Sequence, residues 1–312
     1  MLQKITVVGA GHVGETLAIQ LAKEGLAHKV VVVDILEGIP QGKALDMFES
    51  GPVDGFDTQV IGTNSYAEAK DSELVIITAG VPRKPGMSRD DLLATNADIV
   101  RSVAEDVRKA CPKAIVVVVS NPLDVMCYVT KEATKFPANR VFGMAGVLDT
   151  ARFRTFIADR LKVSVEDIQT LVLGGHGDTM VPLTRYTSVS GIPLTQFLDQ
   201  QEIDGLIERT RKGGAEIVGY LKTGSAYYAP AAAVVQMVKA IVLDKRRILP
   251  CAAWMEGQYG IKDTYLGVPC KLGRGGIEEI VEVQLTDEER AALNKSAEHV
   301  RSTIAALKEL KR

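Results

Sequence analysis

Short, unbroken runs of aliphatic residues separated by helical segments give the strongest constraint on the fold. Within the first 145 residues such runs lie at 5–8, 30–33, 74–78 and 114–119. Between the first two runs, segment 15–26 carries apolar residues at spacings that place them on one face of a helix. Aliphatic runs without polar alternation are typical of strands covered on both faces, as in a parallel sheet. The alternation predicts an α/β fold built on a doubly wound parallel sheet.

The pattern changes after about residue 145. Helical patterns extend over 149–161, 204–221, 229–243 and 287–310, and strand-like runs broken by Gly and Pro occupy 247–283. Strands that are grouped, instead of alternating with helices, are typical of an α+β arrangement. The sequence contains no flexible linker and no internal repeat. We therefore expect the 312 residues to form two tightly packed domains, residues 1–145 and 146–312.

A glycine-rich motif lies where the first predicted strand meets the first predicted helix. Its G-x-G-x-x-G pattern consists of Gly9, Ala10, Gly11, His12, Val13 and Gly14, and Asp34 follows at the end of the second run. This context predicts a Rossmann domain, in which the helix N-terminus binds a pyrophosphate and the aspartate binds a ribose. A carboxylate there would repel a 2′-phosphate, so NAD is favoured over NADP. The alternative is a glycine turn beside a surface aspartate.

Three residues of the second half form a candidate group for proton transfer and anion binding. His176 lies in a glycine-rich turn, where a ligand can approach closely, and an imidazole exchanges protons near neutral pH. Asp149 is the natural partner to orient that ring. Arg152 lies on the same helical face as Asp149, and its guanidinium suits a carboxylate ligand. The alternatives are a structural histidine, an aspartate that caps the helix, and an arginine paired with the protein's own acids.

The segment 79–91 follows the third aliphatic run, at the sheet edge where open parallel sheets bind ligands. It holds Arg83, Lys84 and Arg89 among prolines and glycines, which suits a lid that closes over an anionic substrate. A solvated surface loop is the alternative. Asn121 ends the fourth run at the equivalent edge, where its amide would bond a substrate or a nicotinamide.

Composition excludes several classes of function. Lys and Arg number 37 against 39 Asp and Glu, a net charge of −2, whereas nucleic-acid binders normally carry a basic excess. No apolar run approaches the ~20 residues that span a bilayer, and the N-terminus lacks the features of a signal peptide. We expect a cytoplasmic protein without a metal and without a nucleic-acid or membrane partner. The cysteines lack metal-ligand spacing and are expected to be buried free thiols: Cys111, Cys127, Cys251 and Cys270.

These segments together resemble the lactate/malate dehydrogenase family, and within it the malate dehydrogenases of the lactate-dehydrogenase-like group. The resemblance covers essentially the whole chain and implies a Rossmann domain followed by an α+β catalytic domain. It implies an NAD-dependent oxidoreductase that interconverts (S)-malate and oxaloacetate. The matching segments occur in the family's order: GAGHVG, VVVVDI, ITAGVPRKPGMSRDDLL, VVSNPLDV, GMAGVLDTARFR and GGHGDTMVP.

The resemblance also implies a role for each matching residue. His176 would donate or accept the substrate proton, oriented by Asp149. Arg152 would hold the substrate's C1 carboxylate, and Arg89 would polarise the reacting carbonyl. Asn121 would orient the substrate beside the nicotinamide. The other matching positions would bind NAD or line its cleft: Gly9 to Gly14, Asp34, Asn96, Val119, Ser120 and Asn121.

Arg83 distinguishes between members of the family. Malate enzymes carry Arg at the equivalent position and lactate enzymes typically carry Gln, because oxaloacetate has a second carboxylate where pyruvate has a methyl group. Ala226 also matches the malate pattern. The alternatives are a lactate or other 2-hydroxy acid dehydrogenase, and a catalytically silent NAD-binding scaffold. Family members are dimers or tetramers, so we expect a homo-oligomer, with a tetramer favoured over a dimer.

Overall fold

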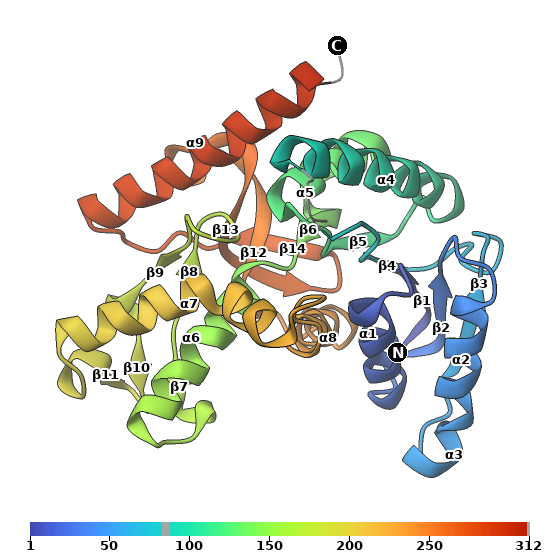
Figure 1. Ribbon diagram of the computed structural model, residues 1–312, viewed down its shortest axis with the longest axis horizontal. Coiled ribbons are helices and arrows are strands. Elements are labelled where there is room, and N and C mark those ends of the chain that lie inside the picture. Colours follow the sequence, from blue (N-terminus) through green and yellow to red (C-terminus); the bar gives the residue numbers. More distant parts are fainter. Residues whose placement is uncertain (83–87, 311–312) are drawn as a thin grey trace.

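The computed structural model describes residues 1–82 and 88–310, in which helices and strands alternate through the first half and separate in the second (Figure 1). The helices are α1 (His12–Lys23), α2 (Ile39–Glu49), α3 (Gly51–Asp54), α4 (Arg89–Ala110), α5 (Leu123–Thr134), α6 (Gly146–Leu161), α7 (Gln200–Leu221), α8 (Tyr228–Val242) and α9 (Asp287–Leu310). The strands are β1 (Leu2–Val8), β2 (Ala27–Val33), β3 (Gln59–Thr63), β4 (Leu74–Ile77), β5 (Ile115–Val118), β6 (Val141–Gly143), β7 (Ile168–Gln169), β8 (Val172–Leu173), β9 (Val181–Pro182), β10 (Ser188–Val189), β11 (Ile192–Pro193), β12 (Arg247–Glu256), β13 (Lys262–Gly273) and β14 (Gly276–Ile280).

The predicted parallel sheet is present and has the strand order of a Rossmann fold. Strands β3, β2, β1, β4, β5 and β6 are parallel neighbours in that order. The four predicted aliphatic runs overlap with β1, β2, β4 and β5. Two further strands, β3 and β6, complete the parallel part and were not among the predicted runs.

Three strands of the second half extend this sheet instead of forming a sheet of their own. Strands β12, β13 and β14 pair antiparallel with one another, and β12 joins β6 through the pair Ala252–Gly143. The predicted grouping of strands in the second half is confirmed, whereas the sheet itself runs through both halves. The domain boundary at residues 145 and 146 lies between the end of β6 and the start of α6 and stays a prediction.

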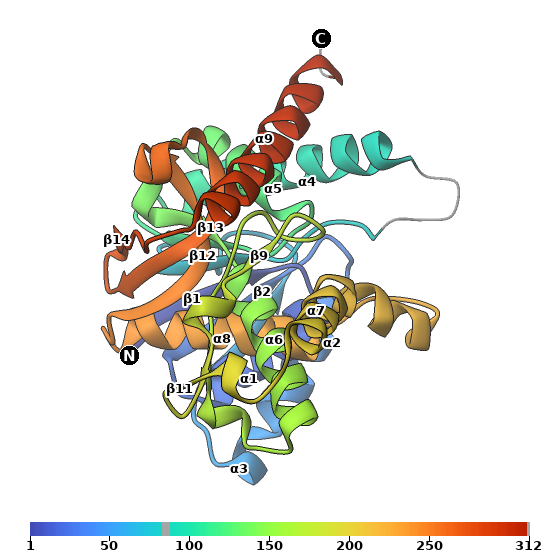
Figure 2. The same ribbon diagram turned by 90° about the vertical axis from the view of Figure 1, so that its left-hand side faces the viewer.

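Helices cover both faces of the sheet, which explains why the aliphatic runs lack polar alternation. Alternate residues of β2 enter two separate buried clusters: Val30 and Val32 belong to one, and Val31 and Val33 to the other. The first cluster includes residues of α1 and α8, and the second includes residues of α4, α5 and α9 (Figures 1 and 2). The four cysteines are buried and free, in agreement with the sequence-based expectation.

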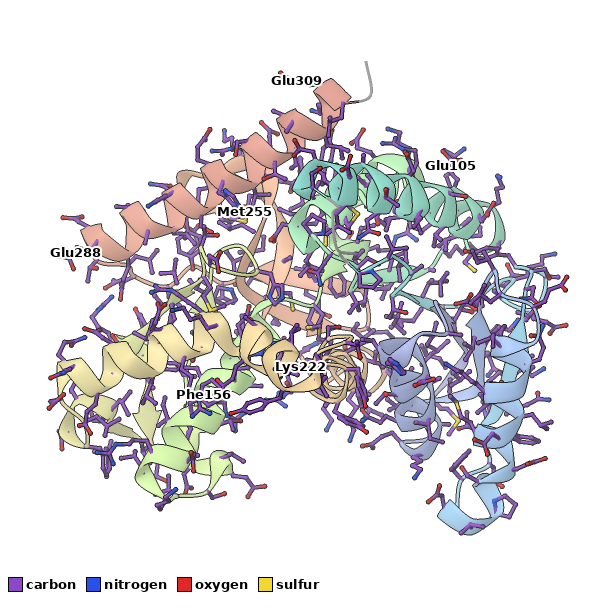
Figure 3. All side chains as sticks on the ribbon, in the orientation of Figure 1. Glu105, Phe156, Lys222, Met255, Glu288 and Glu309 are labelled. Atoms are coloured by element: carbon purple, nitrogen blue, oxygen red, sulfur yellow. The ribbon has the colours of Figure 1, made fainter. Side chains whose placement is uncertain are left out.

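A third buried cluster holds α6 against α7 at one side of the main sheet. At the exposed side of this contact, the guanidinium carbon of Arg209 lies 4.2 Å from the centre of the Phe156 ring, which is labelled in Figure 3. The contact fixes α6, which carries Asp149 and Arg152 in its first half.

Within the described part of the chain, no helix is long and apolar enough to cross a membrane.

Candidate active site

Three predicted segments meet at the edge of the sheet where β1, β4 and β5 end. The Gly9 N–H donates to Val33 O at 2.8 Å, which ties the glycine turn to the end of β2. The Val119 N–H donates to Ile77 O, also at 2.8 Å, which ties the end of β5 to that of β4. Ligands bind at this edge in open α/β sheets. The glycine turn, Asp34 and the segment 119–121 therefore lie along the same edge of the sheet.

Packing of the chain against itself requires two of the three glycines in the turn, Gly9 and Gly14, but not Gly11. A Cβ on Gly9, whose φ is +111°, would lie 2.6 Å from Thr78 Oγ1, and a Cβ on Gly14 would lie 1.8 Å from Gly9 O. Both glycines are therefore required by the close approach of the chain to itself. A Cβ on Gly11 would meet no atom within 4 Å. The chain's own packing does not require Gly11, which fits a ligand that approaches the backbone there.

The start of α1 fits the phosphate groups of a dinucleotide. Gly11 caps the helix without any side-chain hydrogen bond, and His12 and Val13 form the start of the first turn. Free N–H groups at a helix N-terminus attract anions. The Lys43 ammonium, which sequence analysis did not identify, donates to Ala10 O at 2.7 Å and contacts the Glu15 carboxylate. Burial favours the neutral form of Glu15, but hydrogen bonds and charge from Lys43 and His12 outweigh it, so the pKa of Glu15 is lowered.

Asp34 lies at the position expected of a ribose-binding carboxylate. It follows β2, and its Oδ2 accepts a hydrogen bond from the Ala10 N–H at 2.7 Å. Its Oδ1 accepts from the Leu36 N–H at 3.0 Å, so the carboxylate has a fixed orientation beside the glycine turn. The neighbouring Ile35 is 92% exposed and supplies no positive charge for a 2′-phosphate. The arrangement fits NAD.

Asn96 binds the protein backbone instead of presenting a free amide to the cleft. Its Oδ1 accepts from the Val81 N–H at 2.8 Å, and its Nδ2 donates to Asn121 O at 2.8 Å and Val81 O at 3.2 Å. The side chain thus holds Val81, in the segment that follows β4, against Asn121. A contact between Asn96 and the cofactor stays a prediction. The Ser120 hydroxyl also joins these segments, because it donates to Ala79 O.

His176, Asp149 and Arg152 form one connected group. The His176 Nδ1 lies 2.9 Å from Asp149 Oδ2, and Arg152 Nη1 lies 3.4 Å from Asp149 Oδ1. Asp149 is only 2% exposed. It lies in the first turn of α6, whose N-cap is Ala145, so the alternative of a capping aspartate is wrong. The carboxylate bridges the imidazole and the guanidinium.

The environment of His176 favours the protonated imidazole. Burial lowers the pKa of His176, but the charge and hydrogen bond of Asp149, with a contribution from Asp124, outweigh burial and raise the pKa. The imidazole is therefore able to carry a proton near neutral pH, and Asp149 fixes which ring nitrogen is left for a ligand.

Two consecutive glycines of α7 face Arg152, and the approach is tight at Gly213 and ordinary at Gly214. A Cβ on Gly213 would lie 3.0 Å from Arg152 Cδ, and a Cβ on Gly214 would lie 3.6 Å from Arg152 Nη2. Adjacent glycines are unfavourable inside a helix, because each costs about 1 kcal/mol relative to alanine. Their occurrence in the helical pattern was a signal of close approach that the sequence analysis did not use.

Asp124 also belongs to this region and was not predicted. It lies in the first turn of α5, is 6% exposed, and accepts a hydrogen bond from the His176 backbone N–H at 3.0 Å. His176, Asn121 and Asp124 line one cavity of about 510 Å³, between the start of α5 and α9. Within residues 1–82 and 88–310, no group of three His, Cys, Asp or Glu side chains is placed to hold a metal ion.

The three cations of segment 79–91 lie wholly or partly outside the described residues. Arg83 and Lys84 lie outside the described residues. Arg89 is the first residue of α4, which begins at a capping box formed by Ser88 and Asp91, and its side chain lies outside the description. The roles of Arg83 and Arg89 stay predictions.

Comparisons with known proteins agree over the whole chain. Residues 3–143 match the NAD binding domain of lactate/malate dehydrogenase, and residues 146–311 match its alpha/beta C-terminal domain. The malate dehydrogenase of Roseiflexus castenholzii is 56% identical over 310 residues, which cover 99% of this chain and 100% of the relative. The structure of malate dehydrogenase from Salinibacter ruber is similar with a TM-score of 0.95 at 54% identity, covering 99% of each chain. A Cryptosporidium parvum lactate dehydrogenase, complexed with lactic acid and nicotinamide adenine dinucleotide, is also similar, with a TM-score of 0.95 at 45% identity, covering 99% of this chain and 98% of that one.

Proposed function

Because this chain belongs to the lactate/malate dehydrogenase family, we propose that it is an NAD-dependent malate dehydrogenase that interconverts (S)-malate and oxaloacetate. The observation that carries this proposal is the connected group of His176, Asp149 and Arg152 at the edge of the sheet that also holds the dinucleotide turn. Relatives at 55–60% identity over nearly their full length carry the same activity in their names.

We assign different tasks to the two halves of the chain. Residues 1–145 bind NAD, because the glycine turn, Asp34 and the ends of β4 and β5 belong to them. Residues 146–312 supply the substrate-binding and proton-transfer groups on α6 and in the turn that carries His176. The reaction takes place where the two halves meet.

The cofactor would bind along the carboxyl edge of the sheet. The N-terminus of α1 would hold its pyrophosphate, with the close backbone approach at Gly11, and Asp34 would accept hydrogen bonds from the adenosine ribose. Val119, Ser120 and Asn121 would line its nicotinamide end. When bound, the cofactor would supply the hydride acceptor, NAD+, for malate oxidation or the hydride donor, NADH, for oxaloacetate reduction.

The chain's own residues would handle the proton and the charges of the substrate. His176 would give a proton to the carbonyl oxygen of oxaloacetate, or take one from the malate hydroxyl, while Asp149 stabilises the imidazolium. Arg152 would bind the C1 carboxylate through bidentate hydrogen bonds. Arg89 would stabilise negative charge on the reacting oxygen, and Asn121 would fix the substrate's orientation.

We assign the choice of substrate to Arg83, which would pair with the second carboxylate of oxaloacetate. Enclosing that charge against the methyl group of pyruvate would leave the guanidinium unpaired, which costs about 10²- to 10⁴-fold in preference. A lactate or other 2-hydroxy acid dehydrogenase remains the second candidate, because a lactate dehydrogenase has a similar structure at 45% identity. A catalytically silent scaffold is not favoured, because His176, Asp149 and Arg152 are joined by direct contacts.

The substitution His176→Asn tests the proposed proton donor. We expect oxaloacetate reduction to fall by about 10²- to 10⁴-fold, the usual contribution of a general acid, while NADH binding measured by fluorescence is retained. His28→Asn, an exposed histidine on β2, is the matched control and should keep normal turnover. Normal turnover in His176→Asn would refute the assignment.

We further propose a homo-oligomer, with a tetramer favoured over a dimer. Large apolar side chains are exposed on and beside α2, which is unusual for a surface without a partner: Leu45 at 58%, Phe48 at 44% and Val53 at 90%. Light scattering with size-exclusion chromatography would measure the oligomeric state, and a monomer would refute the proposal.

We also propose a cytoplasmic location, because buried free cysteines suit a reducing compartment.

A further inference from the structure

The turn that carries His176 is fixed by three consecutive backbone N–H groups, each bonded to a different element. Gly174 N–H donates to Gly267 O of β13 at 2.9 Å. Gly175 N–H donates to the Ser296 hydroxyl of α9 at 2.7 Å. His176 N–H donates to Asp124 Oδ2 of α5 at 3.0 Å. The backbone beneath the imidazole is therefore held from three sides.

Only one of these three acceptors is charged, and its charge is costly. Asp124 is 6% exposed, and its Oδ1 is buried without a hydrogen-bond partner among the described residues. Burial raises the pKa of Asp124 to about 6, so its ionised form is disfavoured. Ser296 shows that a neutral hydroxyl is enough to accept an N–H of this turn. Holding the backbone therefore does not explain why a carboxylate occupies position 124.

The groups around Asp124 indicate what the charge acts on. Asp149 of α6 and Asp124 both raise the pKa of His176, while Arg152 of α6 lowers it. Asp90 of α4 and His299 of α9 line the same cavity, and the buried Cys127 thiol lies one turn further along α5. His176 lies between two carboxylates, one bonded to its ring and one bonded to its backbone.

We propose that Asp124 is a positioning residue for the proposed reaction, which fixes the backbone of His176 and, as a buried carboxylate, stabilises the protonated imidazole. The inference rests on the proposed function, because it assigns Asp124 to the proton-transfer step. It also links the two sides of the site, since Asn121 lies just before α5 and Asp124 lies in the first turn of that helix. The start of α5 thus positions both the Asn121 amide, which would bind the substrate, and the proton donor.

Two substitutions separate the charge from the hydrogen bond. Asp124→Asn keeps an oxygen that accepts the His176 N–H and removes the charge, whereas Asp124→Ala removes both. Ser296→Ala is the matched control, because it removes the neighbouring bond of the same turn without changing any charge. The measurement is the pH dependence of kcat/KM for oxaloacetate, with the NADH dissociation constant measured in parallel.

We expect both Asp124 variants to lower the apparent pKa of the pH profile by about one pH unit, a tenfold loss of rate on its alkaline side. Asp124→Ala should in addition lower kcat by roughly ten- to hundredfold, because the imidazole is displaced. Ser296→Ala should lower kcat without moving the profile, and NADH affinity should stay constant throughout.

Two results would overturn the inference about Asp124. One is an unchanged pH profile in Asp124→Asn, and the other is an equal shift in Ser296→Ala, which would show that a loosened turn and not the charge sets the profile. A wild-type enzyme that does not reduce oxaloacetate at any pH would refute the proposed function itself, so the two failures are distinguishable.

Discussion

The contact between Asp149 and His176 allows the sharpest prediction about the mechanism. Asp149→Asn keeps the size of the side chain and removes its charge. The carboxylate is 2% exposed, lies 2.9 Å from His176 Nδ1, and also contacts Arg152 at 3.4 Å. The substitution therefore affects the proton donor and the carboxylate-binding guanidinium together.

The size of the effect follows from this geometry. A hydrogen bond to a charged group contributes ~1.5–3 kcal/mol, and opposite charges ~4 Å apart attract by about 4 kcal/mol at an effective dielectric constant of 20. A loss of about 2–4 kcal/mol corresponds to a decrease of roughly 30- to 1,000-fold in kcat/KM for oxaloacetate. Burial, which lowers the pKa of His176, would no longer be opposed by Asp149. The pH profile should therefore shift toward acid.

The assay is NADH oxidation followed at 340 nm from pH 5 to 9, with saturating NADH. Asp178→Asn is the matched control, because this aspartate lies two residues from His176 but is exposed. The control should keep the rate within about twofold of the wild type and the same pH profile, since exposed charges interact weakly. A loss below threefold in Asp149→Asn, with an unchanged pH profile, would refute the role of Asp149.

Three further predictions follow from particular residues. Gly213→Ala should raise KM for oxaloacetate by roughly tenfold, because its Cβ would lie 3.0 Å from Arg152 Cδ. Gly205→Ala on the same helix is the control and should leave the kinetics unchanged, because no atom lies within 4 Å of its Cβ. Equal kinetics in the two variants would contradict the role of Gly213. Arg83→Gln should lower kcat/KM for oxaloacetate by about 10²-fold or more and leave kcat/KM for pyruvate unchanged. An equal loss for both substrates would contradict the role of Arg83. The pKa of Asp124 is raised from 3.8 to about 6, so its contribution to stability is largest below pH 4 and is lost as the pH rises through 6. At pH 8, Asp124→Asn should therefore raise the free energy of unfolding by up to about 3 kcal/mol, seen as a higher Tm than that of the wild type. At pH 4 the two proteins should not differ in this way.

The parts of the fold that the sequence predicted are those with strong local patterns. Unbroken Val and Ile runs predicted β1, β2, β4 and β5, because burial on both faces removes polar alternation. Strand β6 has only three residues, and β3 begins at Gln59 and ends at Thr63, both polar, so neither strand has a clear pattern. The attachment of β12 to β6 rests on the single pair Ala252–Gly143, a long-range contact that local periodicity does not encode.

The candidate site shows the same division between local and long-range information. His176, Asp149, Arg152 and Asp34 were predicted because each lies in a motif with a recognisable chemical purpose. Asp124 was missed because its acceptor role depends on the backbone of a turn more than fifty residues away. The hydrogen bonds of the Asn96 amide to Val81 and Asn121 were not predicted, because sequence alone does not show which groups a buried amide contacts, and its place beside the cofactor stays a prediction.

The most direct test of the proposed function is NADH oxidation at 340 nm with oxaloacetate and with pyruvate, measured side by side on the wild-type protein. A malate dehydrogenase should prefer oxaloacetate by 10²-fold or more, because a charged Arg83 needs the second carboxylate. Comparable or better turnover of pyruvate would contradict the proposal and favour the lactate enzyme.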